Sequence, residues 1–195
     1  MTGSASPDLA AAAAPASAAR TIAFTPRAAR SLRRRRPAGA DPQTFDAARI
    51  GVDDLEQVLD EAGRFAADVI APTNVPGDQF GCAVEDTTVR TAPAFADVHA
   101  QFVENGWQSV AGNPEYDGMG LPRTIALAVA EMCQTANLAY SLMPMLTRDA
   151  ATALEEHGSD EQKAKYLSKL VTGEWAGTMI LTEAQAGTDL GAIKT

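Results

Sequence analysis

The chain has 195 residues, 46% of them hydrophobic, which is enough to bury a sizeable core in one or two domains. Its net charge of -9 combines +5 over residues 1–45 with -14 over residues 46–195. The strongly acidic charge of residues 46–195 argues against a nucleic-acid-binding protein. No apolar run approaches the roughly 20 residues that are needed to span a bilayer. The two cysteines, Cys82 and Cys133, form neither a disulfide framework nor a metal-binding spacing, which favours a reducing, cytoplasmic setting.

Residues 1–45 are rich in Ala, Pro, Ser and Arg and show little periodicity, so they are predicted to form a disordered tail. The tail contains four consecutive arginines, Arg33 to Arg36. The residues that follow, 37–41, are not the apolar segment that a twin-arginine export signal requires. An isolated nucleic-acid patch and a misassigned start of the reading frame remain alternatives for this stretch.

Helices are predicted over residues 53–71, 93–105, 122–138, 142–157 and 160–172. The first has a single apolar stripe with helical spacing, formed by Leu55, Val58, Leu59, Ala62, Phe65, Ala66, Val69 and Ile70. Acidic residues at positions 53, 54 and 56 suit its positive N-terminal end. Pro72 is expected to end it, and residues 74–82 read as a turn-rich connector.

The remaining helices have recognisable ends. Pro93 suits the first turn of the second helix, and Gly106 suits its C-terminal cap. Pro144 is placed in the first turn of the fourth helix, and Ser159 with Gln162 forms a capping box for the fifth. Residues that face inward are Phe95, Val98, Phe102, Trp107 and, by position, His99. A role for His99 as a ligand or base lacks a partner nearby in sequence, so a core position is favoured.

The end of the chain begins as a strand. Met179, Ile180 and Leu181 form a short apolar run that Gly177 precedes. Small residues follow, and Gly187 can take a positive φ and allow another group to approach its backbone. Asp189 can cap the next turn. From the residues alone an ordinary hairpin is favoured, and a loop that presents amides and hydroxyls to a planar ligand is the alternative.

The residues of this segment, Leu-Thr-Glu-x-x-Ala-Gly-Thr-Asp-Leu-Gly-Ala-Ile-Lys-Thr, resemble the flavin-binding signature of the acyl-CoA dehydrogenases. The resemblance implies that the flavin of FAD lies against Met179, Ile180, Leu181 and Thr182. It places Gly187 and Thr188 where the flavin meets the acyl-CoA thioester. One departure is Ala184, where the family usually has proline.

Two further stretches carry the resemblance. Residues 113–121 are similar to the Pro-Glu-x-Tyr-Gly-Gly-x-Gly-Leu loop that joins helices in this family. Residues 76–82, 105–107 and 143–147 are closest to its long branch of 3-methylthiopropanoyl-CoA dehydrogenase-like enzymes. In the family the helix around residues 140–146 borders the acyl pocket, which makes Leu142 and Leu146 candidates to line it. Ordinary core leucines are the alternative interpretation.

The resemblance implies a mainly α fold with three parts: a tail at 1–45, an α-helical N-terminal domain at 46–175, and the first strand of a truncated β-domain at 176–195. The implied function is that of a fragment of an FAD-dependent acyl-CoA dehydrogenase, which converts an acyl-CoA to the enoyl-CoA. An electron-transfer flavoprotein as acceptor and a homo-oligomer when full length are also implied. The catalytic Glu is expected beyond Thr195, and Glu183 is not that base. A catalytically inactive all-α interaction module is the alternative.

Overall fold

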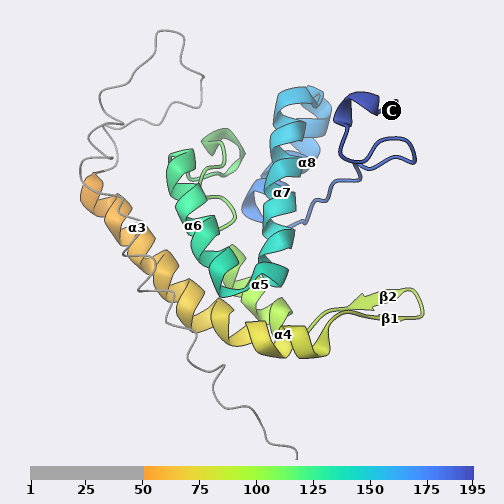
Figure 1. Ribbon diagram of the computed structural model, residues 1–195. Coiled ribbons are helices and arrows are strands. Elements are labelled where there is room, and N and C mark those ends of the chain that lie inside the picture. Colours follow the sequence, from red (N-terminus) through yellow and green to blue (C-terminus); the bar gives the residue numbers. More distant parts are fainter. Residues whose placement is uncertain (1–50) are drawn as a thin grey trace, which may run out of the picture.

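The computed structural model describes residues 51–195, and the predicted tail at 1–45 lies outside the described residues. The fold is mainly α-helical, as predicted, with one small hairpin (Figure 1). Its longer elements are α3 (Val52–Phe65), α4 (Asn74–Phe80), β1 (Ala83–Glu85), β2 (Thr88–Arg90), α5 (Ala94–Glu104), α6 (Arg123–Ala136), α7 (Leu138–His157) and α8 (Asp160–Thr172). In the described residues no helix is both long and apolar enough to cross a membrane.

The first helix does not end at Pro72. The helical path continues from α3 through a π-helical stretch, Ala66–Ile70, and a 3-10 turn, Ala71–Thr73, into α4. Because proline lacks an amide hydrogen, the normal ladder of hydrogen bonds is interrupted at this point. The chain changes the type of turn instead of stopping, so the expectation of a connector over residues 74–82 is wrong for residues 74–80.

Residues 83–90 form an antiparallel hairpin that the sequence did not indicate, with Val84 opposite Val89. Both valines are exposed, and neither strand has a buried face. The apolar alternation that identifies a half-buried strand is therefore missing. Asp86 turns the chain with a positive φ of 54°.

The main core lies between α3, α5, α6 and the start of α7. Ile70 and Ile125 are completely buried there. The Phe65 ring contacts the rings of Phe102 and Trp107 at centroid distances of 6.2 and 6.0 Å. The predicted core positions of Phe102 and Trp107 are confirmed, and the ring of half-buried His99 stacks on Phe102.

Helix α7 begins at Leu138, four residues earlier than expected, so Pro144 lies inside the helix and not in its first turn. The cause is Asn137, which is buried and caps α7 by accepting a hydrogen bond from the Tyr140 amide at 3.1 Å. The capping box predicted for α8 is confirmed. Ser159 Oγ accepts from the Gln162 amide at 3.3 Å, and Gln162 Oε1 accepts from the Ser159 amide at 2.9 Å.

The loop between α5 and α6 is held to both of the last helices. The side-chain amide of Asn113 donates to Glu155 of α7 at 2.8 Å, and Ser168 of α8 donates to Asp117. Asp117 has a left-handed φ of 64° at a position where the family loop has glycine. Aspartate tolerates this conformation better than most residues, and its bond with Ser168 contributes to holding it there.

Residues 176–182 do not form the predicted strand and have no regular secondary structure. An extended segment is stable only when its amides and carbonyls have a partner strand. Within the described residues this stretch has none, so it crosses the helices as an extended connection.

Candidate functional site

The candidate site is the segment that follows α8. Gly173 ends α8 with a left-handed φ of 85°, and the chain then passes α7 and leads into a terminal loop (Figure 1). At the passage, the Gly177 amide donates to the buried hydroxyl of Thr147 on α7 at 3.1 Å. The segment is therefore attached to α7 at Gly177.

The terminal loop is closed by Glu183. Its carboxylate accepts hydrogen bonds from the backbone amides of Lys194 at 3.0 Å and Thr195 at 3.1 Å, and also from the Gln185 side chain. The bond from the Lys194 amide is the main reason that the pKa of Glu183 is lowered. Glu183 and Ala186 also exchange backbone hydrogen bonds. The signature glutamate thus holds the terminal loop closed.

The six signature residues expected at the flavin all lie at the surface. Ile180 is 96% exposed, Met179 and Leu181 are each 46% exposed, and Thr182, Gly187 and Thr188 are exposed as well. Among residues 51–195, the amides of residues 178–182 make no hydrogen bonds. The segment therefore offers unused backbone donors beside apolar side chains, which is the chemistry that a planar, hydrogen-bonding ring system requires.

The backbone conformation of Gly187 differs from the one that the sequence predicts. Its φ is not positive, so the conformational reason for a glycine does not apply at this position. A Cβ atom built on Gly187 would meet nothing within 4 Å. The backbone is therefore open to close approach from outside, and Asp189 caps the turn that follows, as expected, by accepting from the Gly191 amide at 3.0 Å.

The two leucines proposed for the acyl pocket lie one turn apart on α7. Leu142 is 45% exposed and Leu146 is half-buried, and neither belongs to the buried core. Leu146 directly precedes Thr147, the residue that binds Gly177. Helix α7 thus carries the candidate substrate residues and also fixes the start of the candidate flavin segment.

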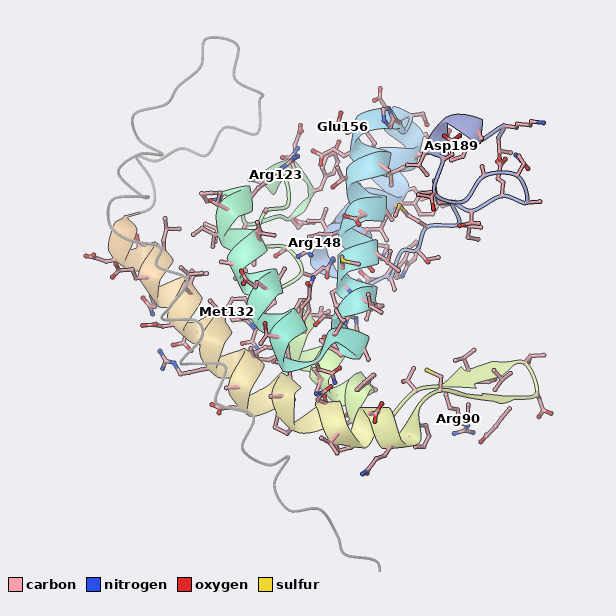
Figure 2. All side chains as sticks on the ribbon, in the orientation of Figure 1. Arg90, Arg123, Met132, Arg148, Glu156 and Asp189 are labelled. Atoms are coloured by element: carbon pink, nitrogen blue, oxygen red, sulfur yellow. The ribbon has the colours of Figure 1, made fainter. Side chains whose placement is uncertain are left out.

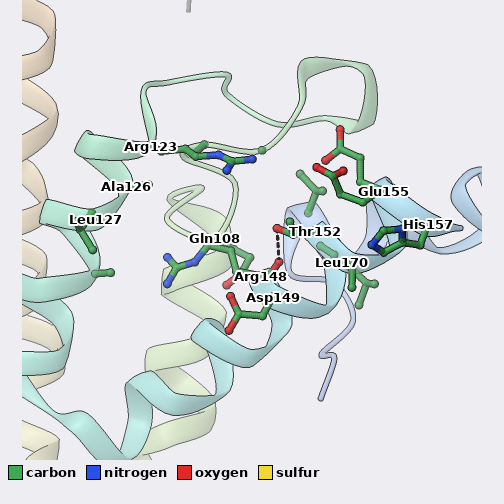
Figure 3. Close-up of a pocket in the computed structure, with 17 residues that line it drawn as sticks. Gln108, Arg123, Ala126, Leu127, Arg148, Asp149, Thr152, Glu155, His157 and Leu170 are labelled. Carbon is green, nitrogen blue, oxygen red and sulfur yellow. Dashed lines mark hydrogen bonds between the residues drawn. The ribbon is translucent and has the colours of Figure 1, made fainter. Parts of the chain in front are cut away.

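The structure also contains a cavity of about 560 Å³ that the sequence did not indicate. Arg123 of α6 and Arg148 of α7 line it, together with carboxylates of α7 and the apolar wall of α6 (Figures 2 and 3). These residues are distant in sequence and look like ordinary helix-surface positions. None of the signature residues, nor Leu142 or Leu146, lines this cavity. The terminal segment is kept as the candidate site because its residues resemble the signature.

Comparisons with known proteins identify the family of the chain. The family model "Acyl-CoA dehydrogenase, N-terminal domain" matches residues 52–174. A 3-methylmercaptopropionyl-CoA dehydrogenase of Ruegeria pomeroyi is 43% identical over 152 residues, which are 78% of this chain and 26% of that protein. A butyryl-CoA dehydrogenase of Syntrophomonas wolfei is 30% identical over 148 residues, which are 74% of this chain and 24% of that protein.

A likeness is also found among solved structures. The fold resembles a chain of a solved structure that is described as the electron transferring flavoprotein of Acidaminococcus fermentans, with a TM-score of 0.59 and 25% identity. The match covers 74% of this chain and 35% of the other. The chain spans about a quarter of the length of the curated relatives named above. The family match, the helical bundle and the signature that follows it agree, and the chain belongs to the acyl-CoA dehydrogenase family.

Proposed function

We propose that this chain supplies the helical N-terminal domain and the flavin-facing segment of an FAD-dependent acyl-CoA dehydrogenase. The observation that supports the proposal best is the terminal segment: residues 178–182 are exposed and their backbone amides are unused, and the Gly187 backbone is open to close approach. Bound FAD would supply the redox chemistry of the reaction. The chain's own residues would bind and orient the flavin and the thioester.

The proposed substrate is an acyl-CoA thioester, and the name of the relative at 43% identity suggests a short sulfur-containing acyl group. Thr188 would lie beside the thioester, and Leu142 and Leu146 would line the acyl pocket. We propose no catalytic base among the residues of this chain. The proposal also includes an electron-transfer flavoprotein as acceptor, a homo-oligomeric state and a cytoplasmic location.

The proposal is tested by joining residues 1–195 to the part of the Ruegeria pomeroyi relative that follows the matched region. The purified fused protein should bind FAD, and an acyl-CoA should bleach the flavin absorbance in the absence of oxygen. A fused protein that folds but binds no FAD would contradict the proposal. Turnover that does not depend on added acyl-CoA would contradict it as well.

Thr182 provides a sharper test of the segment. We expect its hydroxyl to donate to the flavin edge that becomes negative on reduction, which stabilises the reduced form. A hydrogen bond to a charged group is worth about 1.5–3 kcal/mol, and 1.4 kcal/mol corresponds to about 30 mV for two electrons. Thr182→Val should therefore lower the flavin potential of the fused protein by tens of millivolts. Thr88→Val, at an exposed threonine of the hairpin, is the matched control and should leave the potential unchanged.

A further inference from the structure

We propose that Thr147 is a positioning residue for the flavin-facing segment: its contact with Gly177 determines where residues 178–182 leave the helical domain. The proposal rests on the proposed function, because it assigns a purpose to a contact between α7 and the segment that carries the signature. The contact joins residues thirty positions apart in the chain.

The hydrogen bonds of Thr147 are suited to this role. The side chain is 1% exposed, so no solvent competes for its hydroxyl. Its Oγ1 donates to the Met143 carbonyl at 2.9 Å within α7, which fixes the orientation of the hydroxyl. The same oxygen accepts from the Gly177 amide at 3.1 Å and lies 3.4 Å from the Gly177 carbonyl. The hydroxyl therefore presents a preorganised acceptor to a single backbone amide of the segment.

A glycine is needed at position 177 because there is no space for a side chain, and not because the backbone has an unusual conformation. A Cβ atom at this position would lie 2.7 Å from the Cβ of Ala150 and 3.5 Å from a Cδ of Leu170. Its φ is not positive. Two small residues, Gly177 and Ala150, thus allow the extended backbone to approach α7 closely enough for the Thr147 hydrogen bond to form.

Among the described residues, no residue of the helices other than Thr147 forms a hydrogen bond with residues 176–182. The preceding hydrogen bond to the helices is from the Trp175 amide to the Lys169 carbonyl at 3.0 Å, and the following bonds lie within the terminal loop from Glu183 onward. Thr182 is five residues beyond Gly177, a span of at most about 17 Å in extended chain. Release of Gly177 would therefore free the flavin-facing residues relative to Leu142 and Leu146 on α7.

The contact is tested by amide hydrogen exchange in the full 195-residue chain. Thr147→Val keeps the shape of the side chain but removes the acceptor, and exchange of the Gly177 amide should become about tenfold faster. Thr147→Ser keeps the hydroxyl and should restore the slow exchange. Exchange in α3 and α5 should stay unchanged in both variants. Equal exchange in Thr147→Val and the unmodified chain would overturn the proposal.

Gly177→Ala provides a second route to the same result in case Thr147→Val folds poorly. Its methyl group should push the segment off Ala150, break the hydrogen bond to Thr147 and speed exchange of the amide at position 177. Gly187→Ala is the matched control, because a Cβ there meets no atom within 4 Å. Faster exchange in both Gly177→Ala and Gly187→Ala would contradict a specific contact.

The positioning role itself is tested by the dissociation constant for FAD in the fused protein. Thr147→Val should weaken FAD binding by about tenfold, and Thr147→Ser should restore it. Faster exchange with unchanged FAD binding would overturn the positioning role and leave the proposed function intact. A fused protein without substitutions that binds no FAD would overturn both, whatever the exchange result for the contact.

Discussion

Two glycines of the loop between α5 and α6 lie back to back. A Cβ atom built on Gly118 would lie only 2.0 Å from the carbonyl carbon of Gly112. Because that carbon belongs to the backbone, no change of a side-chain rotamer could relieve the overlap. The Gly120 amide donates to the Gly112 carbonyl at 3.0 Å, which holds the two segments of the loop close together. At the scale of single residues, this crossing constrains the sequence more strongly than any other contact that we describe.

We therefore expect Gly118→Ala to destabilise the protein by about 2 kcal/mol or more, because the backbone of the loop must move. The measurement is urea-induced unfolding followed by circular dichroism. Gly187→Ala is the control and should change the free energy of unfolding by no more than about 0.5 kcal/mol. Equal stabilities of the two variants would show that the loop relaxes freely around position 118.

The same scale explains why some residue roles were not predictable. The open backbone of Gly187 was expected, but its φ depends on the terminal loop that Glu183 closes through residues 194 and 195. The role of Thr147 depends on Gly177, thirty residues away, and no local pattern reports such a pairing. Asp189, by contrast, bonds two residues along the chain, so its cap could be read directly from the sequence.

At the scale of elements, the N-terminus of α8 depends on Ser159. Its hydroxyl accepts from the Gln162 amide, one of the amides that the helix leaves without an internal partner. Ser159→Ala should lower the free energy of unfolding by about 1 kcal/mol. The measurement is again urea-induced unfolding.

Thr152→Ala is the matched control for the cap, because the Thr152 hydroxyl is exposed and donates only to the Arg148 carbonyl of its own helix. Its effect should stay within about 0.5 kcal/mol. If Ser159→Ala were as mild as Thr152→Ala, the packing of Leu167 and Val171, and not the cap, would determine where α8 begins.

Elements with local signals were predicted well and those that depend on distant contacts were not. Apolar stripes and caps located α5, α6 and α8 within a few residues. The predicted roles of Pro72 and Pro144 were wrong, because a helical path can continue through a proline when neighbouring residues supply the packing. The strand at 178–182 failed for the opposite reason: its apolar run is local, but a strand needs a partner that the described residues do not provide.

At the scale of the whole molecule, the core consists of helices whose apolar faces could be read from the sequence, while the cavity between α6 and α7 could not. Core residues are recognisable from the periodicity of the sequence. Arg123 and Arg148, by contrast, line one cavity only because α6 and α7 lie side by side in the fold (Figure 3). The candidate site was found by its signature and not by its shape. A surface segment leaves no hollow to detect.

One half-buried group should couple the stability of the fold to pH. His99 packs between the rings of Phe102 and Tyr140, and its Nδ1 has no hydrogen-bond partner among the described residues. Burial lowers the pKa of His99 below its usual 6.5, and a hydrogen bond with the Gly173 backbone acts in the opposite direction but is weaker. The unfolded chain therefore binds a proton at a higher pH than the folded protein does.

It follows that the free energy of unfolding should fall as the pH drops below 6.5 and should level off once the folded His99 is protonated. Urea-induced unfolding at intervals between about pH 7.5 and pH 5.5 avoids most carboxylate titration. His99→Phe keeps an aromatic ring on Phe102 and should remove this decline. His157→Asn, at an exposed histidine near the end of α7, should preserve it. A decline of equal size in His99→Phe would mean that another group, and not His99, links the stability of this fold to pH.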